Sequence, residues 1–282
     1  MLRLSIRGRP DDQRFGALGG LEPFSDVRRR TLLAVLDAAK HARRIEVALR
    51  RSGSPERAEG EKAYLKSDLR FFGATLAEIR RAAKEAGLDR KLDRDGLLEL
   101  VEELWRVPVF ERRMVAALIL DLRADDLRTE DMALIERLIR ESRTWALVDV
   151  LAGDVVGEMA MRLRIRRTLD RWARDDDFWV RRASLLAELE PLKHGAPFEP
   201  FARRADRMLE EREFFIRKAI GWVLRETSKR RPEEVYAWIA PRTHRASGVT
   251  VREAVKYLDA GRADRLMAAY AAGRPAVRPA TG

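Results

Sequence analysis

The stretch EREFFIRKAIGWVLRETSKR, residues 211–230, has the spacing of an amphipathic helix. Its apolar residues recur every three or four positions, at Ile216, Ala219, Ile220 and Val223. A helix over 213–230 would place these side chains on one buried face. The neighbouring residues on the same helix are then the candidates for contact with a partner.

A second row runs beside the apolar face, at steps of four, three and four residues: Lys218, Trp222, Arg225 and Lys229. Residues at this spacing lie along one side of a helix. Lys and Arg there can meet phosphates, and an exposed indole can meet a sugar or a base. The alternative is that Trp222 is half-buried beneath the aliphatic stems of its neighbours.

The same helical periodicity extends through the chain, and no stretch alternates as a strand does. It predicts helices at 26–51, 56–70, 75–87, 94–106, 109–122, 130–142, 144–161, 163–174, 177–190, 198–210, 213–230, 232–239, 250–258 and 261–272. Thr250 and Glu253 fit a capping box at the start of one of them. We expect one all-α domain over 25–272, with flexible tails at 1–24 and 273–282.

Four tryptophans, Trp105, Trp145, Trp179 and Trp222, follow one another at intervals of 40, 34 and 43 residues. HEAT and armadillo repeats, which are stacked helix pairs, have a similar period of about 40–47 residues. A solenoid of such pairs presents one concave face. The spacing therefore favours a repeat architecture.

The composition favours a polyanionic partner. The chain has 57 Lys and Arg against 46 Asp and Glu, a formal net charge of +11, and 48 of its basic residues are Arg. Such a surplus points first to nucleic acid and second to an anionic membrane. The absence of Cys excludes thiolate chemistry, and the three distant histidines make a His-rich metal site or a His-based triad unexpected. We expect no metal and no cofactor.

The longest apolar run, Met114 to Leu120, is far shorter than the ~20 residues that span a bilayer. The first residues lack the apolar core of a secretory signal, and Asp11 and Asp12 argue against a transit peptide. These features predict a soluble cytoplasmic protein.

Asp149 stands in an otherwise apolar run, four residues after Trp145 and so on the same helix face. A carboxylate there is partly desolvated unless a cation or a ligand meets it. Two structural alternatives are open. Asp149 can favour the positive end of its own helix, or it can pair with an Arg from the next repeat.

A third segment, DDDFWVRRASLL at 175–186, begins with acidic residues that suit a helix N-terminus. We expect Val180, Ala183 and Leu186 to be buried, so either Arg181 or Arg182 must face outward. The alternative is an ion pair with the acidic run.

At these segments the chain resembles the DNA alkylation repair enzymes, bacterial alkylpurine DNA glycosylases built of HEAT-like repeats. The resemblance rests on five motifs in the family's order: AYLKSDLRFFG, ELWRVPVFERRMVAAL, RTWALVD, FWVRRASLL and EFFIRKAIGWVLRETSK. It covers roughly residues 56 to 260. It implies an all-α, right-handed superhelical solenoid of antiparallel helix pairs, whose concave basic face holds double-stranded DNA.

The resemblance also implies roles for individual residues. Asp149 matches the catalytic Asp, and Trp145 and Trp222 match the two aromatic residues of the catalytic cleft. The positions matching DNA contacts or the lesion side are Tyr64, Arg182, Arg225 and Lys229, to which the basic row adds Lys218. The chain departs from the family pattern at Thr144, Ala146 and Ala77.

These roles predict a monomeric, nucleoid-associated enzyme that removes purines alkylated at N3 or N7 without enclosing the base. Two other functions remain open: a HEAT-like scaffold for protein partners, and a DNA binder of the same family without catalytic activity. Affinity for DNA separates the scaffold from the other two, and base release separates the enzyme from the binder.

Overall fold

The computed structural model describes residues 24–88 and 92–276, with side chains from residue 37 onward. Most of the predicted N-terminal tail and the last six residues of the predicted C-terminal tail therefore lie outside the described residues. The chain divides between Leu127 and Arg128 into two compact units, and each is described by itself.

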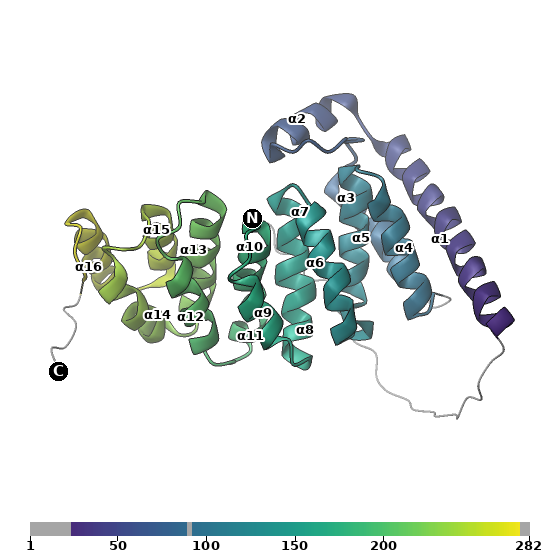
Figure 1. Cartoon of the computed structure of the whole chain (residues 1–282). Helices are drawn as coiled ribbons and strands as arrows, with labels where there is room; N and C mark the ends of the chain where they lie inside the picture. The colour runs from purple at the N-terminus through teal and green to yellow at the C-terminus, as the bar shows by residue number, and fades with distance from the viewer. Residues whose placement is uncertain (1–23, 89–91, 277–282) are drawn as a thin grey trace. The chain divides into compact units, whose positions relative to one another are not determined.

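The first unit is a set of packed helices (Figure 1). Its helices are α1 (Phe24–Ser52), α2 (Pro55–Leu65), α3 (Leu76–Gly87), α4 (Arg94–Arg106), α5 (Phe110–Leu122) and the 3-10 turn η1 (Ala124–Asp126). Helix α1 packs against α3 and α4, and α5 packs against both of these as well. The apolar run that begins at Met114 is buried in α5, as its composition requires.

A buried carboxylate organises the connection from α2 to α3. Glu111 is fully buried, and its Oε1 accepts hydrogen bonds from the backbone N–H groups of Phe72, Gly73 and Ala74 at 2.8, 2.5 and 3.3 Å. Gly73 has φ +76°, and a Cβ there would lie 2.0 Å from the carbonyl oxygen of Ser54, so only glycine fits.

The helix predicted over 56–70 is longer than the helix α2 that the structure shows. The structure ends α2 at Leu65, because the next residue, Lys66, adopts the left-handed conformation with φ +49°. Further along, the backbone of Arg70 pairs with Val109 in an isolated parallel bridge. This bridge fixes the segment that Glu111 then holds.

The second unit is a regular array of helix pairs. Its elements are η2 (Thr129–Asp131), α6 (Met132–Glu141), α7 (Trp145–Asp149), η3 (Val150–Val156), α8 (Gly157–Arg162), α9 (Arg166–Trp172), α10 (Phe178–Leu186), α11 (Leu189–Lys193), α12 (Glu199–Met208), α13 (Phe214–Ser228), α14 (Pro232–Ile239), η4 (Ala240–Arg242), α15 (Gly248–Ala254), η5 (Val255–Tyr257) and α16 (Ala260–Ala271).

We call the first helices of the four pairs, α6, α9, α12 and α14, the first-row helices. They begin at residues 132, 166, 199 and 232, which are 34, 33 and 33 residues apart. The second helices of the pairs, α7, α10, α13 and α15, are the second-row helices. They begin at residues 145, 178, 214 and 248, at intervals of 33, 36 and 34 residues. The described residues contain no strand, so the all-α architecture of helix pairs is confirmed. The repeat is shorter and more regular than the tryptophan spacing indicates.

Ion pairs between successive helix pairs follow the same period. Arg140 binds Asp175 across 35 residues, Arg204 binds Asp170 across 34, and Arg242 binds Asp206 across 36. Each pair joins neighbouring first-row helices or the segments that directly follow them. Much of the high charge content of this chain is therefore used to connect one repeat to the next.

Two local predictions are corrected. The segment 144–161 is not one α-helix, since it is interrupted by the π-helix η3. Thr250 and Glu253 do not form a capping box, because the N-cap of α15 is Ser247, whose side chain accepts from the N–H of Thr250. Thr250 Oγ1 instead donates to the carbonyl of Arg217 in α13, at 3.0 Å.

The first residues of the predicted C-terminal tail are bonded to η4 and the residue after it. The hydroxyl of Thr243 donates to the carbonyl of Arg274 at 2.7 Å, and the N–H of Ala276 donates to the carbonyl of Ala240 at 2.8 Å.

Within the described part of the chain, no helix is both long enough and apolar enough to cross a lipid bilayer.

Glu136 on α6 is a carboxylate bound by several donors. It accepts hydrogen bonds from Arg140 and from the buried indole of Trp172, at 2.7 and 2.8 Å, and from Arg171. The hydrogen bonds from Arg171, Arg140 and Trp172 outweigh the opposing effect of burial and lower the pKa of Glu136 to about 2.

We expect Glu136→Gln to destabilise the fold by about 3 kcal/mol at pH 7, following ~1.4 kcal/mol per pKa unit. A carboxylate with a lowered pKa stabilises the fold above its unfolded pKa of 4.5, and this contribution is lost as the pH falls towards 2. Urea unfolding at pH 7 and pH 3 should therefore show a smaller difference at pH 3. Glu141→Gln, on the same helix but 41% exposed, is the control and should change stability little.

Candidate functional site

The candidate site begins at helix α7, whose N-cap is Thr144. The hydroxyl oxygen of Thr144 accepts from the N–H of Ala146 at 3.5 Å, and Thr144 itself is buried. The departure from the family pattern at this position thus has a local structural role. Helix α7 begins at Trp145 and ends at Asp149, so both predicted residues lie on this one short helix.

The carboxylate of Asp149 is bound by Arg182 of the next helix pair. Arg182 Nε and Nη2 donate to the two oxygens of Asp149 at 2.8 and 3.0 Å, in a bidentate arrangement. The remaining nitrogen, Nη1, donates to the carbonyl of Phe215 at 2.5 Å, at the start of α13. Three neighbouring second-row helices therefore meet at this guanidinium.

Burial is unequal across this pair. The side chain of Arg182 is 1% exposed and that of Asp149 is 12% exposed. Burial raises the pKa of Asp149 above its ordinary value, although the charge and hydrogen bonds of Arg182 oppose the shift. The carboxylate uses two of its acceptor positions on Arg182, so others remain for a ligand on the exposed side.

The structure thus realises the second alternative for Asp149, an ion pair with an Arg one repeat away. It also places Arg182 inside the protein, with its guanidinium directed at Asp149 and at the carbonyl of Phe215. Of the two arginines, Arg182 is the buried one, whereas Arg181 is 19% exposed and binds Glu211 at 2.9 Å and the carbonyl of Asp175 at 2.6 Å.

The π-helix η3 follows Asp149 directly and spans Val150–Val156. A π-helix is rare, and such segments occur frequently at functional sites. Because its hydrogen bonds span one residue more than those of an α-helix, the side chains of α7 and α8 do not continue one α-helical register. The apolar sequence of this segment contains no signal that distinguishes it from an ordinary helix.

An aromatic cluster that the sequence analysis missed joins the starts of α10 and α13. The ring of Trp179 lies 4.4 Å from Phe178 and 4.8 Å from Phe215, between ring centroids. The guanidinium carbon of Arg182 lies 5.8 Å from the centroid of the Phe215 ring. The cluster therefore fixes the helix ends that hold Arg182, and through it Asp149.

Trp222 lies on α13, about two turns beyond Phe215, and it is half-buried, as is Trp145. Helix α10 contacts both α7 and α13, so the two tryptophans come from helices on either side of it. The glycine before Trp222 has a structural reason. A Cβ on Gly221 would lie 2.7 Å from the Cβ of Glu253, so glycine permits the close approach of α13 and α15.

The predicted basic row on α13 is largely paired with acids. Lys218 and Arg225 both bind Glu253 of α15, at 2.7 and 2.5 Å. Lys229 binds Glu226 at 2.9 Å, and its ammonium lies 4.6 Å from the centroid of the Tyr257 ring. The cations of this row are therefore still partly exposed. Their acidic partners, however, reduce the net charge of the row below what the sequence indicates.

Glu253 is ionised throughout the physiological range. Burial raises its pKa, but the hydrogen bonds from Lys218 and Lys256 and the charge of Arg225 outweigh this and hold the pKa at about 2.

Tyr64, the remaining predicted residue, lies on α2 in the first unit, where its side chain is 72% exposed.

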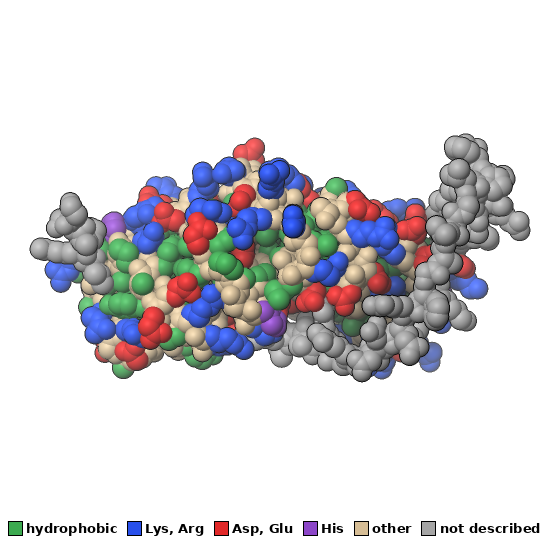
Figure 2. Space-filling model, turned by 90° about the horizontal axis from the view of Figure 1, so that it is seen from below, with side chains coloured by type: hydrophobic (Ala, Val, Ile, Leu, Met, Phe, Trp, Pro, Cys, Tyr) green, Lys and Arg blue, Asp and Glu red, His purple; other side chains and the backbone are tan. Residues whose placement is uncertain are grey.

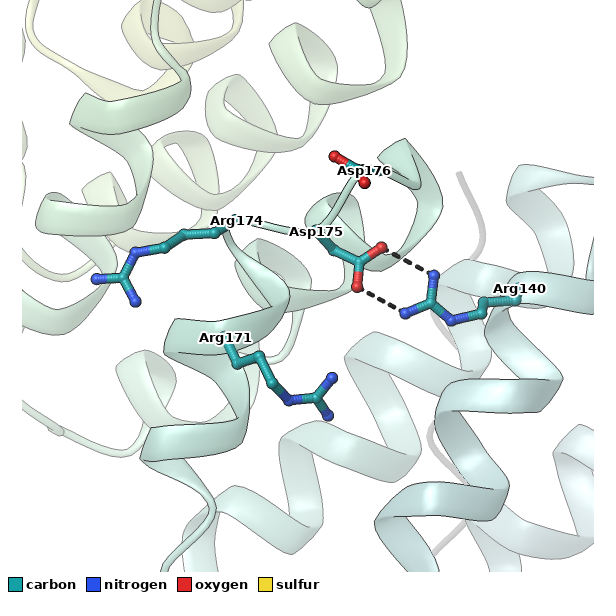
Figure 3. Close-up of a pocket in the computed structure, with 5 residues that line it drawn as sticks. All are labelled: Arg140, Arg171, Arg174, Asp175 and Asp176. Atoms are coloured by element: carbon teal, nitrogen blue, oxygen red, sulfur yellow. Dashed lines mark hydrogen bonds and ion pairs between the residues drawn. The ribbon is translucent and has the colours of Figure 1, made fainter.

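An open pocket of about 550 Å³ in the second unit is lined by Arg140, Arg171, Arg174, Asp175 and Asp176 (Figure 3). Arg140 binds Asp175 with two hydrogen bonds of 2.8 and 2.6 Å, whereas Arg174 points away from that pair. The pocket contains none of the predicted site residues. Among the described residues, no three His, Cys, Asp or Glu side chains group as metal ligands.

Comparison with known proteins identifies the family. Residues 45–258 match the family model described as DNA alkylation repair enzyme, and this range includes all the predicted site residues. A search of curated proteins gives no match.

Solved structures share the fold. One from Enterococcus faecalis, described as a predicted DNA alkylation repair enzyme, is 24% identical, with a TM-score of 0.68 over 74% of this chain and 98% of its own. AlkD2 from Streptococcus mutans is 19% identical, with a TM-score of 0.53 over 72% of this chain and 100% of its own. Since the family model covers more than half of the sequence, the chain belongs to the DNA alkylation repair enzyme family.

Proposed function

We propose that this protein is a DNA glycosylase that hydrolyses the N-glycosidic bond of cationic N3- or N7-alkylated purines in double-stranded DNA, without enclosing the base. The observation that carries the proposal is Asp149: a largely buried carboxylate, held in orientation by Arg182 and still 12% exposed, in the Trp-x-x-x-Asp motif of the family.

The chemistry follows from the leaving group. A purine alkylated at N3 or N7 is positively charged and departs readily, through a sugar with oxocarbenium character. The ionised Asp149 stabilises that sugar and orients a water molecule for attack. Trp145 and Trp222 add the attraction of their π-faces for the developing positive charge.

In this proposal Arg182 is a positioning residue. All its donor groups described above are used inside the protein, on Asp149 and on the carbonyl of Phe215. A carboxylate held by a bidentate pair cannot rotate freely, and a fixed charge costs no reorganisation during the reaction. The predicted contact of Arg182 with DNA stays a prediction.

The DNA contacts in this proposal come from Tyr64, Lys218, Arg225 and Lys229. The protein acts as a monomer in the cytoplasm, associated with the nucleoid, and uses neither a metal nor a cofactor.

Incubation with methylated duplex DNA, followed by chromatography of the released bases, tests the activity. Release of 7-methylguanine or 3-methyladenine supports it, and intact DNA after prolonged incubation at excess enzyme contradicts it.

A second candidate is a DNA binder of this family without catalytic activity. The observation that favours it is the same Arg182 pair, because a carboxylate bound by two hydrogen bonds is also a common structural element. This candidate predicts DNA binding without base release in the assay above.

Binding to DNA should depend strongly on salt and weakly on sequence. If about six phosphates are neutralised, affinity falls by ~10³ between 50 and 200 mM salt. Lys218→Ala, Arg225→Ala and Lys229→Ala should each reduce the salt slope by about one. Arg203→Ala, an exposed cation on the first-row helix α12, is the control. A titration in which affinity does not change with salt would favour a protein scaffold.

A further inference from the structure

Helix α1 carries a disproportionate share of the positive charge. Its 29 residues contain eight Lys and Arg against three Asp and Glu, a net charge of +5 out of the +11 of the whole chain. On the face shown in Figure 2, Lys and Arg side chains are interspersed with Asp and Glu among the described residues. For its length, α1 therefore carries far more net positive charge than the rest of the chain.

The described part of α1 is two-sided. The buried side consists of Ala38, Ala42, Ile45 and Leu49, which recur every three or four residues and face the helices α3 and α4. The opposite side is exposed and contains Lys40, Arg43, Arg44, Val47 and Arg51. We call the four cations of this side, Lys40, Arg43, Arg44 and Arg51, the α1 basic face.

The acids of α1 do not neutralise this face. Glu46 lies towards the packed side, where it binds Arg50 at 2.7 Å and the buried Arg112 of α5. No ion pair joins any cation of the α1 basic face to a described acidic residue, and Asp37 is the only exposed acid of the described part of the helix. The four cations are therefore exposed, and no described acidic side chain forms an ion pair with them.

The α1 basic face also lies almost wholly outside the family match. The match begins at residue 45, whereas three of the four cations precede it and only Arg51 falls within it. Most of this surface therefore lies outside the part of the chain that the family model matches.

We propose that the α1 basic face is a second DNA-binding surface, which contacts backbone phosphates of a duplex. From Lys40 to Arg51 the cations are separated by 11 residue steps of helix, or about 16 Å at 1.5 Å per residue. A duplex presents about one negative charge per 1.7 Å of its axis, so a segment of that length offers enough phosphates for all four. The proposal rests on DNA being the substrate, but not on the role of Asp149.

A membrane fits this surface less well. A helix that binds in a bilayer interface inserts a free apolar face, with cations on the polar side. The apolar face of α1 is already buried against α3 and α4, and the exposed side has one large apolar residue, Val47, which is 58% exposed. The exposed side thus offers charge without an insertable apolar surface.

The test uses the full-length protein with Lys40, Arg43, Arg44 and Arg51 all changed to Gln. A matched control removes four exposed cations from the first-row helices α9 and α12: Arg166, Arg167, Arg203 and Arg207. Both variants lose the same net charge. Affinity for an undamaged 30-base-pair duplex is measured by fluorescence anisotropy between 50 and 200 mM salt, and circular dichroism monitors the fold.

We expect the α1 variant to lower the salt slope by three to four units, because each lost phosphate contact removes about 0.9. Its affinity at 100 mM salt should fall at least tenfold, and a variant with only Lys40→Gln and Arg44→Gln should show about half the change in slope. The control should bind like the wild type. Single-turnover base release at saturating enzyme should be unchanged in both variants.

Three results would overturn the proposal: a slope within half a unit of the wild type, an equal loss in the control variant, or binding to phosphatidylserine vesicles that the α1 variant abolishes while DNA binding is retained. The proposed glycosylase activity fails separately. A wild-type protein that releases no base, but whose α1 variant has a reduced slope, leaves the α1 basic face established as a DNA-binding surface.

Discussion

Asp149→Asn is expected to retain DNA binding and to lose at least about a hundredfold in the rate of base release. The amide has nearly the volume of the carboxylate but no charge, so it cannot stabilise a cationic sugar. Loss of one preorganised electrostatic group at a reacting centre typically costs about 10²–10³ in rate. Because the charge acts on the transition state, the ground-state affinity for DNA should change little.

The assay is single-turnover release of 7-methylguanine, with DNA affinity measured in parallel. The substitution leaves the buried Arg182 without its counter-ion, so thermal unfolding must show that the variant is folded at the assay temperature. Asp176→Asn, an exposed residue in the loop before α10, is the matched control and should release base at the wild-type rate. A rate for Asp149→Asn within threefold of the wild type would eliminate the catalytic assignment.

The pH dependence of release provides an independent signature of the same residue. Burial raises the pKa of Asp149, against the opposing effect of Arg182, so protonation begins at a higher pH than for an ordinary Asp. Release requires the ionised carboxylate, and its rate should therefore fall as the pH is lowered through that raised pKa. The residual rate of Asp149→Asn should lack this acidic limb.

The helices were predictable because the periodicity of the apolar residues is strong. In α13 the predicted apolar positions Ile216, Ala219, Ile220 and Val223 are all buried. Where the prediction failed, a tertiary contact decides the local structure. Helix α2 ends early because Lys66 turns into the left-handed region where Glu111 holds the following loop, and Glu111 is 39 residues away from Phe72.

The residues of the candidate site come from the family motif and stay a prediction, whereas the pairing of Asp149 with Arg182 could not be chosen from the sequence. The motif around Asp149 can be identified in the sequence, whereas the choice between Arg181 and Arg182 as the inward residue depends on how α10 rotates against α7. The repeat contained a usable signal, because Asp149 and Arg182 are 33 residues apart and Lys218 and Glu253 are 35 apart. Oppositely charged residues one repeat apart on the same row of helices are candidates for such pairs. The π-helix after Asp149 had no comparable signal.

Base release should be confined to purines that are already cationic. A neutral base leaves only when an acid protonates it, and this requires a proton donor within hydrogen-bond reach. In the described part of the chain, the side chain that hydrogen-bonds to Asp149 is Arg182, whose guanidinium does not give up its proton at any ordinary pH. Asp149 itself serves as a carboxylate, so its proton is not available for the leaving group in the active form.

The measurement uses matched duplexes that differ only in the lesion. 7-Methylguanine or 3-methyladenine should be released, while uracil, hypoxanthine and 8-oxoguanine should remain in the DNA. Trp145→Ala and Trp222→Ala should slow release of the cationic bases by the ~0.5–2 kcal/mol of a cation–π contact, and more if the half-buried indoles also support the packing of α7 and α13. Efficient release of uracil or hypoxanthine would require a general acid at the site, and the mechanism through Asp149 alone would then be wrong.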